Sequence, residues 1–288
     1  MNIDAGQTVL LTGASGGLGT HLTRAFAKTG AKLALVAYPG DELITLRDEV
    51  RRAGGTAIAL ARDLRLSDER QEVVAEVRKE FGATDILVNN AGIEFTSPYD
   101  VLSEQNIVDV LRVNLEATMI MSWLVLPEML RRGKGHIVNM SSLAGKANPA
   151  LQEPYAASKA GLIGFTYSLR ASYRSAGVSA SAIVPGFVET GIYTRLKERS
   201  GLAAPKLLGT SSPEKVVAAV IRAVQRDLPE VIINPIPVRP LLALCALLPR
   251  VGERALAMTG GHDFFRRVFQ ASRRGQETRK TTETTVAK

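Results

Sequence analysis

The stretch "TVLLTGASGGLG", residues 8–19, determines how this sequence can fold. It opens with an apolar run typical of a buried strand, and a cluster of glycines follows before a helical pattern begins. Gly13 permits a tight turn, Gly17 lets a ligand approach the backbone, and Gly19 lets the helix pack on the strand. The amide groups at the start of such a helix favour phosphate. The stretch therefore predicts a dinucleotide-binding strand–loop–helix unit.

The rest of the chain repeats this alternation of apolar runs and amphipathic segments. Most of the runs lack polar alternation, as in strands buried on both faces of a parallel sheet. Strands are predicted at residues 8–11, 32–37, 56–60, 85–89, 136–140, 178–184 and 230–234. Helical patterns that each end at a glycine lie at residues 18–30, 41–55 and 67–82. This order predicts an α/β fold, with a doubly wound parallel sheet of about seven strands in three layers and one domain at residues 1–235.

Three segments depart from this alternation of predicted strands and helices. Residues 187–212 form a long connection after the sixth strand, which is typical of a lid, and we expect them to cover a substrate. Residues 236–270 form an apolar C-terminal extension, which packs on the body, lies across a subunit interface, contacts the substrate or touches lipid; the sequence leaves these alternatives open. Residues 271–288 are polar, and their composition predicts disorder.

The composition excludes several functional classes. The formal net charge is +8, of which four charges lie from Gly261 onward, and no basic stripe with interleaved aromatic residues indicates nucleic-acid binding. Cys245 is the only cysteine, and no cluster of His, Cys, Asp and Glu predicts a metal site. The longest apolar runs, 119–130 and 240–249, are shorter than the about 20 residues that span a bilayer, and the start lacks a signal-peptide pattern. These features predict a soluble, cytoplasmic protein.

Polar residues follow several of the predicted strands. Asp63 follows the third strand, "NNAG" (89–92) the fourth and "NMSS" (139–142) the fifth. The C-terminal ends of parallel strands share the edge where open α/β sheets bind ligands. The stretch "YAASK" (155–159) then begins a long helix predicted over 155–175. Its tyrosine and lysine are spaced to share one helix face, so the ammonium group can lower the pKa of the phenol, which predicts a general acid/base pair.

Together these motifs resemble the short-chain dehydrogenase/reductase family, in its common single-domain form, over about residues 6–235. The resemblance rests on the order of "TGASGGLG", Asp63, "NNAG", Asn114, Ser142, "YAASK" and "PGFVET" (185–190). It implies a Rossmann-type fold and nicotinamide-dependent hydride transfer. The implied catalytic residues are Asn114, Ser142, Tyr155 and Lys159, with Ser141 as the alternative to Ser142. The implied cofactor-binding residues are Gly13, Ser15, Gly16, Gly17, Leu18, Gly19, Tyr38, Asp63, Leu64, Asn90, Ala91, Gly92, Tyr155, Lys159, Pro185, Gly186, Val188 and Thr190.

The chemistry of these side chains agrees with the implied roles. Tyr155 exchanges a proton with the substrate oxygen, and Lys159 lowers the pKa of that phenol and holds the nicotinamide ribose. Ser142 hydrogen-bonds the substrate oxygen. From the resemblance, we expect Asn114 to hold a water molecule that links Lys159 to solvent and Asp63 to face the adenine.

The end of the second strand bears on the choice of cofactor. An acid there would select NAD, but position 37 is alanine and is followed by Tyr38. No arginine follows at position 38 and no basic residue stands at Gly16, so the usual signature of NADP is missing too. Without the acid a 2′-phosphate meets no repulsion, and Tyr38 or Ser15 can hydrogen-bond it. The sequence favours NADP and leaves NAD open.

The expected reaction is the interconversion of a ketone and a secondary alcohol on a lipophilic small molecule, which is steroid-like, retinoid-like or fatty-acyl-like and includes 3-oxoacyl groups on an acyl carrier protein. The alternative is a catalytically retired relative that binds nucleotide and partners. The apolar faces of the helices around 103–131 and 155–175 predict a homodimer or homotetramer, because such helices pair across two-fold axes in the family that this sequence resembles.

Overall fold

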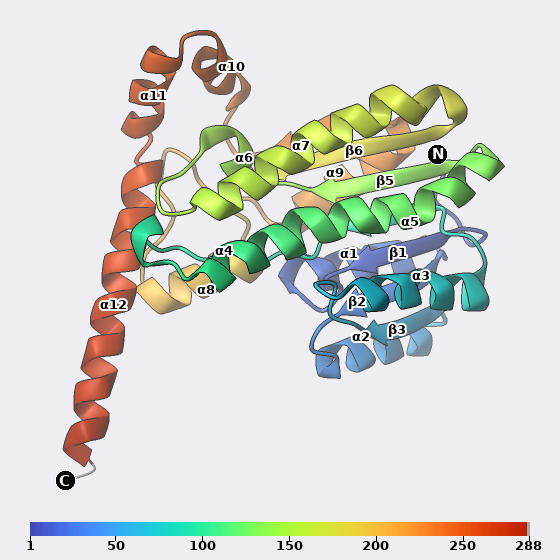
Figure 1. The fold of residues 1–288 in the computed structure, drawn as a ribbon, viewed down its shortest axis with the longest axis horizontal. Helices are drawn as coiled ribbons and strands as arrows, with labels where there is room; N and C mark the ends of the chain where they lie inside the picture. The colour runs from blue at the N-terminus through green and yellow to red at the C-terminus, as the bar shows by residue number, and fades with distance from the viewer. Residues whose placement is uncertain (287–288) are drawn as a thin grey trace.

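Within the described residues, the computed structural model has a central parallel sheet with the strand order β3-β2-β1-β4-β5-β6-β7 (Figure 1). The structure describes the backbone of residues 1–286 and the side chains of residues 1–40 and 42–274. The strands are β1 (Thr8–Thr12), β2 (Lys32–Ala37), β3 (Ala57–Ala61), β4 (Ile86–Asn89), β5 (Gly135–Met140), β6 (Val178–Pro185) and β7 (Glu230–Ile233). Each predicted strand lies within one residue of these bounds, and the predicted doubly wound α/β fold is confirmed.

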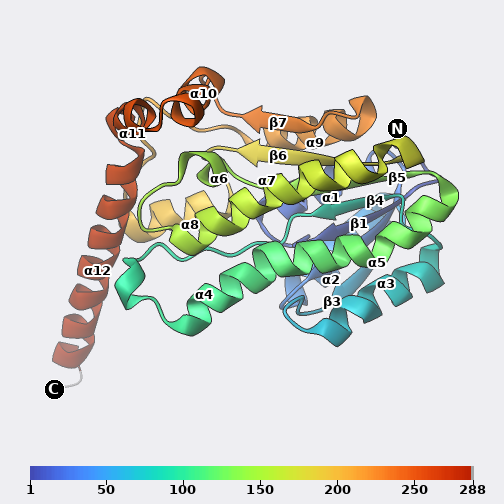
Figure 2. The same ribbon diagram turned by 45° about the horizontal axis from the view of Figure 1, so that its top comes forward.

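Helices cover both faces of the sheet, which gives the three predicted layers (Figure 2). One face carries α1 (Gly17–Ala27), α2 (Asp41–Arg52) and α9 (Pro213–Arg226). The other face carries α3 (Ser67–Phe81), α5 (Ala117–Arg132) and α7 (Glu153–Tyr173). In β1, Val9 and Leu11 pack with the first set of helices, and Leu10 packs with the second. Successive residues of a strand point to opposite faces, so a strand buried on both faces is apolar at every position.

One helical stretch among the described residues, Glu104–Arg132, is long and apolar enough to cross a membrane by length and composition. It consists of α4 (Glu104–Leu111), a π-helical turn η2 (Arg112–Glu116) and α5. Met121, Val125 and Met129 of α5 are buried against the sheet. The stretch is therefore a core helix of this fold.

The strand order reverses between β1 and β4, which lie side by side with Leu11 next to Val88. The glycine loop after β1 and the "NNAG" segment after β4 therefore leave the sheet next to each other, at the kind of switch point where open α/β sheets bind ligands. On the other side of β4, Nδ2 of Asn89 donates a hydrogen bond to Oδ1 of Asn139 in β5 at 2.9 Å. The motifs that follow three strands thus converge on one edge of the sheet.

The segments that depart from the alternating pattern gather at this edge. The predicted lid, residues 187–212, contains the helix α8 (Gly191–Ser200). The extension forms α10 (Arg239–Leu247), α11 (Pro249–Met258) and α12 (Gly261–Val286), and α12 runs past α8 (Figure 1). The remaining short elements are η1 (Tyr99–Val101), α6 (Ala144–Ala147) and η3 (Arg174–Ala176).

The disorder expected for residues 271–288 stays a prediction. The backbone of α12 continues as a helix past residue 271 to Val286. Adding a residue to an existing helix forms one hydrogen bond per residue fixed, so a helix that is already anchored by packing can extend into a polar sequence. Composition alone does not reveal such a continuation.

Candidate active site

A cavity of about 300 Å³ lies at the edge of the sheet where the motifs converge. Its walls come from the glycine loop, the segment after β4, the ends of β5 and β6, α7, the lid and the extension. The predicted residues that line it are Gly13, Gly16, Gly17, Leu18, Asn90, Ala91, Gly92, Ser142, Tyr155, Lys159, Pro185, Gly186, Val188 and Thr190. The other predicted residues, which do not line it, are Ser15, Gly19, Tyr38, Asp63, Leu64 and Asn114.

The glycine loop forms a cradle that is lined by backbone. Gly13 has φ +63°, a conformation that residues with side chains rarely adopt, and Nδ2 of Asn90 holds the loop by donating to the carbonyl of Gly13 at 3.0 Å. A Cβ atom on Gly17 would overlap Gly191 and Thr190 at the start of the lid helix. The first turn of α1 contains no acidic residue. These features fit the phosphates of a dinucleotide, which need close backbone amides and no neighbouring negative charge.

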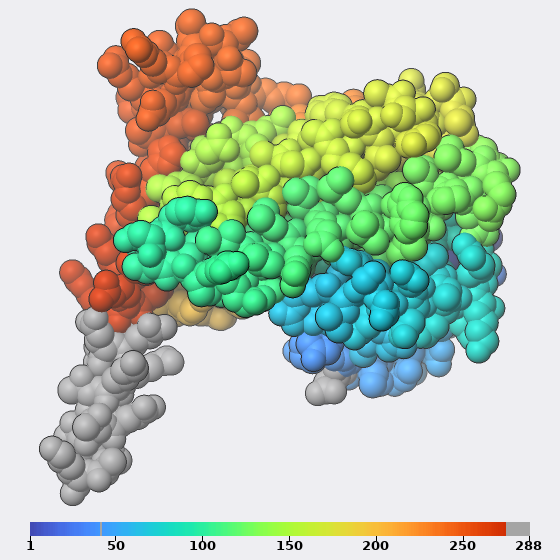
Figure 3. Space-filling model, in the orientation of Figure 1, coloured from blue at the N-terminus to red at the C-terminus, as the bar shows by residue number. Residues whose placement is uncertain are grey.

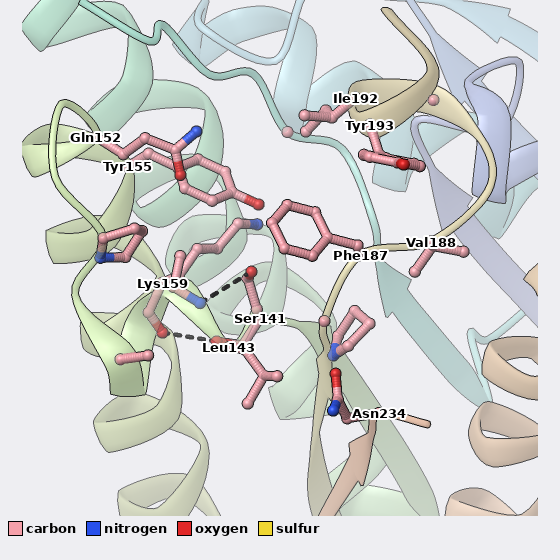
Figure 4. A pocket seen from close by; sticks show the side chains of 18 of the residues that line it. Ser141, Leu143, Gln152, Tyr155, Lys159, Phe187, Val188, Ile192, Tyr193 and Asn234 are labelled. Carbon is pink, nitrogen blue, oxygen red and sulfur yellow. Dashed lines mark hydrogen bonds between the residues drawn. The ribbon is translucent and has the colours of Figure 1, made fainter. Parts of the chain in front are cut away.

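Tyr155 and Lys159 lie on one face of α7 and point into the cavity (Figure 4). Both side chains are buried, and Nζ of Lys159 lies 5.6 Å from the centre of the tyrosine ring and donates to the carbonyl of Met140 at 2.8 Å. Ser142 acts on the Tyr155 phenol and lowers its pKa. Ser141 instead donates from its Oγ to the backbone carbonyl of Lys159 at 2.7 Å. Both serines line the cavity, and the choice of Ser142 over Ser141 stays a prediction.

Burial acts against the low pKa that the sequence predicts for Tyr155. Burial raises this pKa to about 12, while the hydrogen bond with Ser142 lowers it and the charge of Glu94 raises it further. Burial also lowers the pKa of Lys159 to about 8. The lowering of the tyrosine pKa by Lys159 during turnover stays a prediction.

Asn114 lies behind the cavity, in the π-helical turn between α4 and α5. Its Nδ2 donates to the carbonyl of Ile93 at 2.9 Å and to Oγ of Ser158 at 3.1 Å, and its Oδ1 accepts from the amide of Ile93 at 2.8 Å. These bonds use both amide hydrogens and leave one acceptor position on Oδ1. Asn114 therefore ties the segment after β4 to α7, and its role in holding a water molecule stays a prediction.

The residues predicted to hold the adenosine end lie outside the lining of the cavity. The Asp63 carboxylate accepts hydrogen bonds from the backbone amide of Arg65 at 3.0 Å and from its guanidinium group, which lowers the pKa of that carboxyl. Tyr38 is exposed just beyond the end of β2, and Ala37 is buried. The position beside Ala37 thus has an exposed hydroxyl and no acid.

Sequence reasoning missed a buried carboxylate next to the catalytic tyrosine candidate. Glu94, three residues after Ala91, accepts hydrogen bonds from Oγ1 of Thr96 at 2.8 Å and from Nε2 of Gln152 at 3.2 Å. Its carboxylate also lies 3.5 Å from Nη2 of Arg199 in α8. Only the position of Glu94 directly after "NNAGI" could have indicated it.

Sequence reasoning also left open which surface the extension covers. Its side chains form the far wall of the cavity, and the residues that do so are Val238, Leu241, Leu242, Leu256, Thr259, His262 and Phe265. An aromatic cluster holds this wall in place, since the ring of Phe187, after β6, lies 5.2 Å from that of Phe264 and 5.4 Å from that of Tyr193 in α8. The backbone amide of Ala150 donates to Nδ1 of His262 at 3.2 Å. The extension is therefore part of the site.

Comparisons with known proteins agree with this architecture. Residues 7–201 match the family described as short chain dehydrogenase. The ketoacyl reductase HetN of Nostoc sp. is 38% identical over 265 residues, which cover 90% of this chain and 91% of that protein. A metagenomic short-chain oxidoreductase solved in complex with NADP has a TM-score of 0.69 and 31% identity over 82% of this chain and all of its own. A putative NAD(P)-dependent gluconate 5-dehydrogenase of Beutenbergia cavernae, solved with bound NADP, has a TM-score of 0.70 and 28% identity, and the match covers 79% of this chain and 94% of that one.

The parallel sheet and the glycine cradle at its switch point agree with the family match over residues 7–201. The chain belongs to the short-chain dehydrogenase family and is an oxidoreductase that acts on CH–OH groups.

Proposed function

We propose that this protein uses NADP(H) to interconvert a lipophilic ketone and its secondary alcohol, with Tyr155 as the general acid/base. The observation that carries the proposal is that Tyr155 and Ser142 line one largely apolar cavity together with the glycine cradle. A substrate oxygen between these two hydroxyl groups would receive a hydrogen bond from each.

Each side chain then has a defined task. When bound, the nicotinamide supplies the hydride for reduction or accepts it in oxidation. Tyr155 is neutral at pH 7, as an ordinary tyrosine is, and it donates the phenolic proton to the carbonyl oxygen during reduction. Ser142 orients that oxygen. Lys159 holds its ammonium group beside the phenol and stabilises the phenolate that remains after the proton is transferred.

NADP is the proposed cofactor, with NAD as a second possibility. No acid stands at the end of β2, so nothing there repels a 2′-phosphate, and Tyr38 and Ser15 can hydrogen-bond it. The two similar structures named above contain NADP, which supports the same assignment here.

The substrate class is inferred from the far wall of the cavity. Leu241, Leu242 and Leu256 of the extension line the cavity together with Phe187 and Ile192, and such an apolar lining suits an aliphatic chain. The similarity to a ketoacyl reductase supports a fatty-acyl-like substrate, such as a 3-oxoacyl group, ahead of the steroid-like and retinoid-like alternatives. The idea of a retired relative loses its support, because the chain belongs to a family of oxidoreductases.

The test is Tyr155→Phe, assayed with NADPH and NADH on 3-oxoacyl thioesters of increasing chain length. The ring volume is kept and only the hydroxyl is lost, so kcat is expected to fall ~100- to 10,000-fold with little change in cofactor affinity. Tyr167→Phe is the matched control, since Tyr167 lies on the same helix and does not line the cavity. Wild-type turnover by Tyr155→Phe would refute the mechanism, and a preference for NADH would refute the cofactor assignment.

A further inference from the structure

Helices α10 and α11 form a hairpin with exposed apolar side chains on its outer surface. The hairpin projects from the body of the molecule (Figure 3). At its turn, Leu247 and Leu248 are 79% and 55% exposed, and Val251 in the first turn of α11 is 50% exposed. Met258 follows two turns after Val251, on the same face of the helix, and is 82% exposed. These four side chains, which we call the hairpin patch, are concentrated in one short stretch, whereas apolar residues on a free surface are usually scattered.

The exposure does not result from a loosely packed flap. Gly252 of α11 is buried against Cys245 of α10, and a Cβ atom at this position would overlap the cysteine backbone, so the two helices are in close contact. On the opposite side, Leu242 and Leu256 line the cavity. The hairpin therefore has one apolar side that closes the active site and another that faces solvent.

Positive charge accompanies the hairpin patch. Residues 236–288 contain ten Lys/Arg and four Asp/Glu, and seven of the ten basic residues follow the hairpin, from Arg266 onward. Within the hairpin, Arg239, Arg250 and Arg254 stand against Glu253. Arg239 lies 3.7 Å from Glu230, whereas the exposed Arg250 and Arg254 have no ion-pair partner among the described side chains.

These charges decide between two possible occupants of the patch. A second copy of the chain, packed hairpin against hairpin, would bring two positively charged surfaces together, which opposes association. Anionic lipid offers acyl chains to the aliphatic side chains and phosphates to the two arginines. We propose that the hairpin patch docks this protein on an anionic membrane surface, with Leu247, Leu248, Val251 and Met258 in the interfacial layer. The docking is independent of turnover and goes beyond the proposed function.

The test is flotation of the full chain with vesicles of phosphatidylcholine alone and of phosphatidylcholine mixed with phosphatidylglycerol. The wild type should float with the mixed vesicles, and added salt should weaken this binding. The double variant Leu247→Ser/Leu248→Ser removes inserted apolar surface and is expected to weaken binding by about 10-fold or more. Arg250→Glu/Arg254→Glu should weaken binding to the mixed vesicles by about 10-fold or more, since each arginine near an anionic surface contributes a several-fold effect.

Ile44→Ser is the matched control, because Ile44 is an exposed aliphatic residue of α2, on a different helix layer. Thermal unfolding checks that each variant is folded, and Met258→Ser replaces the double serine variant if that one is not. The proposal is overturned if the wild type does not float with either kind of vesicle. It is equally overturned if the hairpin variants float to the same extent as the wild type. It is also overturned if the leucine variants break up an oligomer in sedimentation while the wild type does not bind vesicles, since a second copy would then cover the patch.

Discussion

At the scale of one residue, the buried ammonium group of Lys159 lowers the stability of the fold. The side chain is buried, its Nζ donates to the carbonyl of Met140, and no carboxylate pairs with it among the described side chains. Burial lowers its pKa to about 8 from an ordinary value of 10.5. The folded state therefore binds this proton more weakly than the unfolded chain does. Below pH 8 this difference destabilises the fold by about 3 kcal/mol, and the penalty disappears as the pH rises to 10.5.

Lys159→Met is accordingly expected to stabilise the protein while abolishing turnover. The gain at pH 7 should be about 1 to 2 kcal/mol, because the removed penalty is partly offset by the unpaired carbonyl of Met140. Urea unfolding at pH 7 and pH 10.5 measures it, and the difference between variant and wild type should shrink at the higher pH. A variant that is less stable than the wild type at pH 7 would show that the buried ammonium group does not destabilise the fold.

At the scale of elements, a buried histidine in β5 should make the stability of the fold depend on pH on the acid side. His136 is buried, and its Nε2 lies 2.8 Å from Oγ of Ser181 in β6. Burial lowers the pKa of His136 to about 4 from 6.5. The charge of Asp227 opposes this shift, and that of Arg170 adds to it. The folded protein holds this ring neutral over a range in which the unfolded chain protonates it. The stability contributed by the neutral ring is complete above pH 6.5 and is lost as the pH falls through that value toward 4.

His136→Gln should therefore flatten the acid side of the stability profile. Between pH 6.5 and pH 4, the wild type is expected to lose about 3 kcal/mol more unfolding free energy than the variant. The reason is that the unfolding of the variant takes up one proton fewer. Denaturant titrations across this range give the slope. Equal slopes in the wild type and His136→Gln would contradict the prediction.

The elements also show what the sequence could predict. Strands such as β1 were predicted because burial on both faces leaves an uninterrupted apolar run, and the glycine loop because its backbone demands Gly13 and Gly17. The side of the molecule that the extension covers was not predictable, since an apolar composition indicates burial without naming the partner surface. The raised pKa of Tyr155 and the proximity of Glu94 depend on distances across the fold, which no spacing along the chain reveals.

At the scale of the whole molecule, the outer face of the α4–α5 stretch has the character of a subunit contact. Trp123 is 64% exposed, and Leu111 and Met119 are exposed on the same stretch. Large aromatic side chains at the centre of an apolar face often dominate the energy of an interface. We propose that this face pairs across a two-fold axis to form a homodimer or homotetramer.

Trp123→Glu is expected to reduce the oligomer to smaller species, because a desolvated carboxylate would lie at the centre of the paired face. Sedimentation velocity at micromolar concentration distinguishes the species. Ile44→Glu on α2 serves as the control for a charge added at an exposed apolar position and should leave the assembly intact. A 30.9 kDa monomer in the wild type would contradict the proposed assembly.

The cavity takes its walls from distant parts of the chain, and this has a consequence for biosynthesis. Residues from Gly13 to Thr190 form the cradle and surround the tyrosine, whereas the far wall begins at Val238 and is complete only at Phe265. A ribosome adds roughly 5 to 20 residues per second, so several seconds separate the emergence of these two parts. During that interval the nascent chain lacks the far wall of the cavity. A polypeptide that ended before Val238 would thus contain the glycine cradle and Tyr155 without the wall that encloses a substrate.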